Sequence, residues 1–369
     1  MAPQEHQHRE VTPEVITPIK KLFIATRGEI AVRAIRACQD KERGITPVIP
    51  YSLEDSNALI TRIADQNGWP LVAIGGTSAE ESYANPDKIL EEARFAGCDA
   101  IFPGYGFLSE NADFIRACEE AGMRVLAPPS PVMELAGNKI KARERAKKVK
   151  IGRVAHIPVL EGSGNLPTFQ DALNAAVQLT YPVMLKDPDT GGGMGNLVVH
   201  NQGELENAYR QLRMRSGNRE VFMERFIANA VHVEVQIAED AYGNVVSLGE
   251  RDCTMQRRHQ KIVEESPSPN ISQHLRETIQ TAAVEFARNI KYQGVGTWEF
   301  IVDRDRPGRG DDPAWYFMEI NPRIQVEHPV TEEQTKVKQT KVDIVGLMID
   351  IAEGRKLGFS QEDIQPSGH

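Results

Sequence analysis

The sequence contains little that marks a secreted, membrane-bound or nucleic-acid-binding protein. Its four cysteines are widely scattered among 369 residues and form no CxxC pair. That pattern favours free thiols in a reducing compartment over a disulfide framework or a zinc site. No apolar run has the length needed to span a bilayer, so we expect no membrane segment. The net charge of −9 gives no reason to expect nucleic-acid binding.

The N-terminal segment also lacks a targeting signal. It is polar, without the apolar centre of a signal peptide, and too acidic for a typical transit peptide. We therefore expect residues 1–19 to be a disordered lead-in and the protein to be cytoplasmic. A chain of this length favours two or more domains, although no internal repeat or long low-complexity linker marks a boundary.

Between residues 21 and 121, short apolar segments alternate with helical patterns. We expect strands at residues 21–25, 47–51 and 98–102, and helices at 30–41, 56–64, 86–96 and 112–121. Strands that alternate with helices predict a parallel open sheet, which binds ligands beyond the C-terminal ends of its strands. The segment 102–111 lies at one of those ends.

Beyond Gly137 the pattern changes. A cation-rich helix is expected at 139–150, followed by a strand, a glycine-rich segment and a second strand at 182–186, 190–195 and 196–200. This order predicts a hairpin, unlike the strand-to-helix turn of a dinucleotide fold. Further strands are expected at 221–226, 232–237, 297–302 and 315–320, the last two paired, and helices at 277–289 and 333–352.

Two segments suit phosphate or nucleotide binding. The glycines from Gly191 to Gly195 could expose backbone N–H groups to phosphates, with the charge of Lys186 beside them. A flexible hairpin tip is the alternative, and Lys139 can equally be a surface lysine. Residues 221–227 end in a backbone segment that suits an adenine pocket or an ordinary half-buried strand.

A basic segment at residues 250–261 carries five potential cations, namely Arg251, Arg257, Arg258, His259 and Lys261. Mutual repulsion predicts a folded loop that holds these cations around an anion or carboxylates. A solvated basic loop is the alternative.

Two carboxylates lie in apolar surroundings. Glu299 lies between Trp298 and Phe300, and Glu319 lies in the strand that we expect to pair with it. A buried unpaired carboxylate is costly, so each needs a cation or a proton. A hairpin would bring both carboxylates, with the Asn321 amide, to one divalent ion such as magnesium, which prefers oxygen ligands.

The segment 319–329 alternates polar with apolar residues or proline. On an extended strand its polar members would all face one side, which predicts a metal–phosphate site beside an anion pocket. These members are Glu319, Asn321, Arg323, Gln325 and Glu327. A solvated strand face is the alternative, and Pro322 argues against an ordinary central strand.

Together these segments resemble the biotin carboxylase family of ATP-grasp enzymes, which carboxylate the biotin of acyl-CoA and pyruvate carboxylases. The resemblance extends from Lys21 to His369 and is carried by residues 27–31, 103–111, 249–253, 256–261 and 323–332. It implies an α/β fold with a Rossmann-like parallel-sheet domain at 20–136 and an ATP-grasp domain at 137–352. A glycine-loop lid would occupy about 155–226, and 353–369 would begin a C-terminal domain that is mostly absent.

The resemblance also implies roles for individual residues. ATP would be bound by Lys139, Lys186, Gly192, Gly193, Glu224, Arg225, Phe226, Ile227, His232, Gln256 and His259. Magnesium or manganese would be held by Glu299, Glu319 and Asn321, and bicarbonate by Lys261, Arg323, Gln325 and Val326. Glu327 would be the base, and Tyr105 would flank the biotin.

Several departures from the family pattern leave alternatives open. Asp187 and Asp189 stand where the family has small residues, Met194 replaces a customary basic residue, and residues 336–340 look inserted. A nucleotide-binding scaffold or regulatory subunit without turnover is therefore a second hypothesis. A third is another ATP-grasp ligase of the carbamoyl-phosphate synthetase kind, which the segment 325–329 disfavours.

The resemblance implies partners as well. The sequence has no Met-Lys-Met biotin-attachment tripeptide, so the biotin would be carried by a separate biotin carboxyl carrier protein or domain. A carboxyltransferase domain or subunit and a second copy of the chain, as a homodimer, are the other expected partners.

Overall fold

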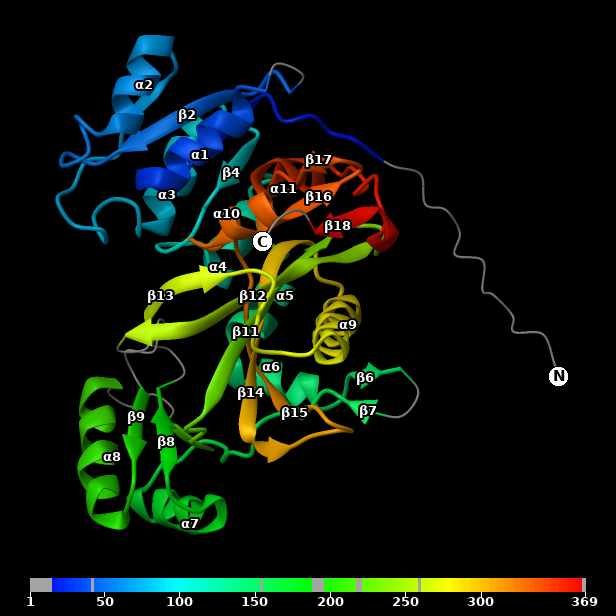
Figure 1. Cartoon of the computed structure of the whole chain (residues 1–369). Coiled ribbons are helices and arrows are strands. Elements are labelled where there is room, and N and C mark those ends of the chain that lie inside the picture. The colour runs from blue at the N-terminus through cyan, green and yellow to red at the C-terminus, as the bar shows by residue number, and fades with distance from the viewer. Residues whose placement is uncertain are drawn as a thin grey trace.

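The computed structural model describes residues 15–40, 43–152, 155–187, 196–216, 221–257 and 260–366. Its N-terminal part is a parallel sheet (Figure 1). Apolar cores lie on both faces of this sheet. The strands run in the order β3-β2-β1-β4-β5. They are β1 (Lys21–Ile24), β2 (Thr46–Tyr51), β3 (Leu71–Ala73), β4 (Ala100–Phe102) and β5 (Arg124–Val125). Every pairing is parallel, which confirms the predicted open sheet.

Four helices cover this sheet. They are α1 (Gly28–Cys38), α2 (Leu59–Asn67), α3 (Pro86–Phe95) and α4 (Ala112–Glu120). Asn85 and Asn111 begin α3 and α4, because each side chain accepts a hydrogen bond from a backbone N–H of the first turn. Successive residues of β1 point to opposite faces, so Leu22 and Ile24 join one core while Phe23 joins the other.

Two short helices, α5 (Ser130–Gly137) and α6 (Lys139–Ala146), connect this sheet to the rest of the chain. The side chain of Asn138 caps α6 by accepting a hydrogen bond from Lys141 N at 2.9 Å. The helix ends at Ala146, so the prediction that it continues to residue 150 is wrong. A small strand pair follows, β6 (Lys150–Ile151) with β7 (Ala155–His156).

The predicted glycine-loop hairpin forms, with β8 (Val183–Lys186) antiparallel to β9 (Asn196–Val199). It belongs to a small sheet of order β10-β8-β9, in which β10 is Phe222–Arg225. Helices α7 (Phe169–Leu179) and α8 (Gln202–Ser216) cover it around a separate apolar core. Figure 1 shows this unit at the opposite end of the molecule from the N-terminal sheet.

A long antiparallel sheet of order β13-β12-β11-β14-β15 lies between these two parts (Figure 1). Its strands are β11 (Ala230–Glu239), β12 (Val245–Arg257), β13 (Gln260–Glu265), β14 (Gly294–Pro307) and β15 (Pro313–Asn321). The apolar side of helix α9 (Gln273–Ile290) packs on one face, where Ile279 and Phe286 join Trp298 and Phe317 in the core. The opposite face is therefore left for polar side chains.

The C-terminal part corrects one prediction. Residues 333–352 do not form one helix; α10 (His328–Gln334) and α11 (Ile344–Ala352) are separated by a hairpin of β16 (Thr335–Val337) and β17 (Thr340–Lys341). Lys338 and Gln339 form its two-residue turn with φ values of 48° and 73°. Strand β18 (Ile364–Pro366) follows a 3₁₀ turn at Gln361–Asp363 and pairs with β16. The backbone of residues 335–337 thus forms hydrogen bonds with β18, which it could not do as part of a continuous helix.

All four cysteines are free and buried. Burial raises the pKa of the Cys38, Cys98 and Cys118 thiols to about 12. Among the residues that the structure describes, no helix combines the length and the apolar character needed to cross a bilayer.

Candidate active site

The polar face of the long sheet, the small sheet and α6 enclose a cleft of about 580 Å³. Of the predicted site residues within the described ranges, all but Tyr105 line it. They are Lys139, Lys186, Glu224, Arg225, Phe226, Ile227, His232, Gln256, Lys261, Glu299, Glu319, Asn321, Arg323, Gln325, Val326 and Glu327. Residues that are up to about 190 positions apart in the chain thus share one space.

Four predicted residues are not placed in this cleft. Gly192, Gly193 and His259 lie outside the described residues. Tyr105 lies in the loop after β4, where its half-buried ring packs against the core of the N-terminal part. The same loop reaches the cleft through Glu110, which accepts a hydrogen bond of 2.7 Å from Arg323 Nε.

A β-bulge in β15 determines which side chains of this strand face the cleft. Glu299 is opposite Glu319 and Trp298 is opposite Ile320, but Phe300 is opposite Phe317, so Met318 is an extra residue. Because of it, Phe317 and Ile320 both enter the apolar core although they are three residues apart. Met318, Glu319 and Asn321 line the cleft instead.

Glu299, Glu319 and Asn321 therefore meet as the predicted hairpin requires. Asn321 Nδ2 donates to Glu299 Oε1 at 2.8 Å, and Lys139 Nζ lies 2.8 Å from Glu319 Oε2. His232 Nε2 lies 2.8 Å from the other oxygen of Glu299. Burial raises the pKa of Glu299, but the charges of Lys261 and His232 hold it well below its usual range. Two carboxylates and an amide oxygen fit a hard cation such as magnesium.

We call the cations near α6 the α6 end of the cleft: Lys139, Arg143 and Lys186, with Glu224 between them. Lys139 and Arg143 are one helical turn apart and lie on the same side of α6. The carboxylate of Glu224 pairs with both Arg143 and Lys186, and Arg143 Nη2 also donates to the Leu160 carbonyl at 2.7 Å. Burial, and then the charges of Lys139 and Arg143, lower the pKa of Lys186 to about 7. This end is arranged to receive negative charge.

Sequence reasoning did not identify Arg143. Its side chain is only 11% exposed, which is unusual for an arginine and shows that it faces the cleft and not the solvent. The available signal was its spacing of four residues from Lys139 in a helical pattern.

The segment around Arg225 joins the two sheets. Arg225 Nη1 lies 2.9 Å from Asp303 Oδ2, and the guanidinium lies over the Tyr316 ring at 5.5 Å. These contacts hold the Arg225 side chain against β14 and β15 and fix the backbone that leads to Phe226 and Ile227. Nearby, Gln256 Nε2 lies 2.7 Å from His232 Nδ1, which orients the imidazole.

We call the surroundings of Lys261 the Lys261 end of the cleft. Lys261 Nζ lies 2.6 Å from Glu327 Oε1 and 3.2 Å from Glu299 Oε1, and it also binds Glu234. Burial lowers the pKa of Lys261, but the charges of Glu299 and Glu234 raise it far above its usual value. The ammonium group therefore keeps its charge and connects Glu299 to Glu327.

Arg251 differs from the prediction. It does not belong to a basic loop with Lys261, because β12 continues to Arg257 and carries Arg251 into the interior, where its side chain is 0% exposed. Its Nε donates to Glu234 Oε1 at 2.6 Å, and its Nη2 donates to Gln325 Oε1 at 3.0 Å. Arg251 thus fixes two residues of the Lys261 end without lining the cleft.

The segment after Asn321 also corrects a prediction. The strand ends there, and residues 322–327 form a turn into α10. Pro322 has no N–H to continue the ladder, which explains the end of the strand. Arg323, Gln325 and Glu327 still line the cleft, because the turn and not a strand face directs them there. Val326 is 61% exposed at its mouth.

Comparison with known proteins gives consistent matches. The profile of the biotin carboxylase N-terminal domain matches residues 18–133, and that of the carbamoyl-phosphate synthase L chain ATP-binding domain matches residues 139–360. Biotin carboxylase 1 of Bacillus subtilis is 42% identical over 355 residues, which are 95% of this chain and 74% of that protein.

Two solved structures are similar throughout. A biotin carboxylase complex from Campylobacter jejuni is 40% identical, with a TM-score of 0.84, over 95% of this chain and 74% of that one. The biotin carboxylase domain dimer of 2-oxoglutarate carboxylase from Hydrogenobacter thermophilus is 41% identical, also with a TM-score of 0.84, over 95% and 73%. That structure contains MgADP, ADP and bicarbonate.

Proposed function

We propose that this chain, which belongs to the biotin carboxylase family, uses ATP and bicarbonate to carboxylate biotin on a carrier protein. One observation carries the proposal: Lys261 contacts both Glu299 of the metal-binding pair and Glu327. A single cleft therefore joins a metal–phosphate site to a site for a small anion beside a carboxylate base. Phosphoryl transfer to bicarbonate requires this adjacency.

In the proposed complex, the α6 end binds the ATP phosphates through Lys139, Lys186 and Arg143, together with Gly192 and Gly193. Glu224, His232, Gln256, His259 and the backbone from Arg225 to Ile227 bind the adenosine. Glu299, Glu319 and Asn321 would hold magnesium or manganese, which supplies charge neutralisation at the β- and γ-phosphates. The pairing of Glu224 with Arg143 and Lys186 supports these roles, because phosphates can take over both cations.

At the Lys261 end, bicarbonate lies among Lys261, Arg323, Gln325 and Val326. Glu327 takes its proton, and the resulting oxyanion attacks the γ-phosphorus while the bond to the ADP oxygen breaks. The carboxyphosphate product then divides into carbon dioxide and phosphate. The phosphate accepts the N1′ proton of biotin, and the nitrogen attacks carbon dioxide beside Tyr105.

The test is ADP formation by the full chain with ATP, magnesium and free biotin, with and without bicarbonate. We expect turnover that depends on bicarbonate, and carboxybiotin as a product. ATP binding without phosphate release would overturn this proposal in favour of a nucleotide-binding scaffold or regulatory subunit. Carbamoyl phosphate formed from bicarbonate and ammonia would favour the other ATP-grasp ligase.

The organisation and partners are part of the same proposal. We place a Rossmann-like domain at residues 20–136 and an ATP-grasp domain at 137–352, with the lid at about 155–226 and the start of a C-terminal domain at 353–369. We propose a biotin carboxyl carrier protein and a carboxyltransferase as partners, a homodimer as the assembly, and the cytoplasm as the location. The dimer of the Hydrogenobacter thermophilus relative supports the assembly, which light scattering of the purified chain will test.

A further inference from the structure

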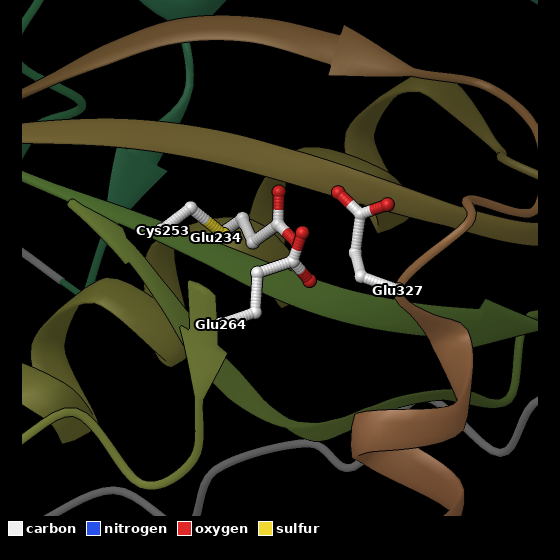
Figure 2. Close-up of side chains that lie close together, drawn as sticks. All are labelled: Glu234, Cys253, Glu264 and Glu327. Carbon is white, nitrogen blue, oxygen red and sulfur yellow. The ribbon is translucent and has the colours of Figure 1, made fainter. Parts of the chain in front are cut away.

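Glu264, on the edge strand β13, has no role in the reaction as described so far, yet its carboxyl group lies close to that of the proposed base. One side-chain atom from each of Glu234, Cys253, Glu264 and Glu327 lies within 4.8 Å of the corresponding atoms of the other three. Figure 2 shows the carboxyl group of Glu264, from β13, beside that of Glu234, and Glu327 facing both from the turn before α10. Glu264 also lines the cleft, and the strand that carries it is at the edge of the long sheet.

The cations near Glu264 form ion pairs with carboxylates other than that of Glu264. Lys261 binds Glu234, Glu299 and Glu327, and Arg251 binds Glu234. Among the described residues, the buried Oε2 atom of Glu264 has no hydrogen-bond partner. A buried oxygen with neither a cation nor a donor is the place where a proton is most strongly held.

The charges that face Glu264 agree with this geometry. Burial, and then the charges of Glu327 and Glu234, raise the pKa of Glu264 to about 7, and Lys261 and Arg251 offset only part of that rise. The Cys253 thiol stays neutral, because burial raises its pKa far above the physiological range. Two close carboxyl groups with too few cations share one proton, as coupled acids do.

We propose that Glu264 is the partner carboxyl of Glu327: the pair holds one proton at rest, and Glu264 releases to solvent the proton that Glu327 takes from bicarbonate. This inference rests on the proposed function. In the step, the bicarbonate O–H bond breaks and an O–H bond forms on Glu327. One of the two protons then on the pair passes through Glu264 to water, and each electron pair stays on its oxygen. Glu264 is thus a positioning residue for proton transfer and does not touch the substrate.

The kinetic test is Glu264→Gln, which keeps the shape of the side chain but cannot ionise. Glu265→Gln is the matched control, because Glu265 is the next residue on the same strand and is exposed. In the unaltered protein, at constant bicarbonate concentration, the alkaline limb of kcat/KM should have its midpoint near the Glu264 pKa of about 7, because the pair loses its resting proton above that pH. In Glu264→Gln this limb should disappear, because glutamine has no proton to lose in this range, and kcat should fall roughly tenfold.

KM for ATP should stay unchanged in both variants, and Glu265→Gln should keep the original profile. A Glu264→Gln protein that folds normally and retains the original pH profile would overturn the inference. A lower kcat with an unmoved profile would overturn it as well, because that result describes a purely structural role.

A second measurement does not depend on turnover. Carbon-13 NMR of labelled glutamate carboxyls should show Glu264 titrating near pH 7, and Glu327→Gln should lower that midpoint by removing the neighbouring charge. The proposed pairing of Glu264 with Glu327 would be refuted if Glu264 titrated at the usual pH for a glutamate. It would also be refuted if Glu327→Gln left the titration midpoint of Glu264 unchanged. A protein without bicarbonate-dependent turnover in which Glu264 titrates as expected would instead refute the proposed function and leave the pair standing.

Discussion

The two ends of the cleft have opposite charge balances. At the α6 end, Lys139, Arg143 and Lys186 face the carboxylates of Glu224 and Glu319. Cations exceed carboxylates there, and burial together with their mutual repulsion lowers the pKa of Lys186. Such a site gains most from a polyanion, which brings the missing negative charge and takes over donors that are already in place.

At the Lys261 end the carboxylates are in excess. Lys261 faces Glu234, Glu299 and Glu327, His232 contacts Glu299 from the other side, and Arg251 supports Glu234 from the interior. The excess keeps Lys261 charged and leaves a carboxylate available as a base. The difference teaches that binding a polyanion and removing a proton from a small anion require opposite charge balances, which one cleft provides at its two ends.

The largest effect is expected from the replacement of Lys261. Among the described contacts, it is the one cation that Glu234, Glu299 and Glu327 share. Lys261→Met should lower the free energy of unfolding by about 3–5 kcal/mol, because it removes the cation that three buried carboxylates share. It should also abolish ADP formation. Urea unfolding measures the first effect. Lys147→Met, on an exposed lysine of the chain, is the control and should change stability by less than about 0.5 kcal/mol. Equal stability of the two variants would contradict our view of the Lys261 end.

The next effect separates binding from chemistry. Glu327→Gln should lower kcat for bicarbonate-dependent ADP formation roughly a hundredfold or more, since it removes the proposed base. The dissociation constant for ATP should be unchanged, because the α6 end keeps all of its cations. Calorimetric titration with ATP checks binding, and a loss of ATP affinity parallel to the loss of rate would show that the two ends are not independent.

A smaller effect is expected at the α6 end. Arg143→Met should raise KM for ATP about tenfold, corresponding to one charge-assisted hydrogen bond, with little change in kcat. Arg145→Met is the matched control, because Arg145 is on the same helix but its Nε donates to Asn289 Oδ1 at 2.7 Å, away from the cleft. If both variants had the same KM, Arg143 would have no part in ATP binding.

The smallest effect concerns the contact between Arg323 and Glu110. The Glu110 side chain is 45% exposed, so solvent screens this pair. Glu110→Gln should change stability by less than about 1 kcal/mol and KM for bicarbonate by a few-fold at most. Steady-state kinetics at several bicarbonate concentrations will check this, and a large rise in KM would mean that Glu110 holds Arg323 in its binding position.

The alternating elements of the N-terminal part were predictable, because buried parallel strands and amphipathic helices have distinct local patterns. The hairpin partners Glu299 and Glu319 were predictable for a similar reason, since carboxylates in apolar strands need a shared cation. The hairpin within residues 333–352 was not predictable from periodicity, because the pairing of β16 with β18 depends on residues nearly thirty positions away. Tertiary pairing of this kind overrides local preference.

Arg251 and Arg143 were missed for opposite reasons. Arg251 has four other basic residues nearby in sequence and was grouped with them, yet the continuous strand β12 separates it from Lys261 and buries it beside Glu234. Arg143 lies in a cation-rich helix, where only one face meets the cleft. In both cases the chemistry depends on which side of an element faces inward, and charge patterns alone do not contain that information.

The extra residue at Met318 determines how this hairpin can vary in evolution and in protein engineering. It sets the core residue Phe317 and the site residue Glu319 on opposite faces of β15. Substitutions on one face can therefore accumulate without altering the other. Loss of Met318 would leave these faces as they are, because Phe317, Glu319, Ile320 and Asn321 would then simply alternate between core and cleft, whereas an added residue would exchange the two faces. We expect this hairpin to accept amino-acid replacements and the loss of Met318, and to reject an insertion at the same point.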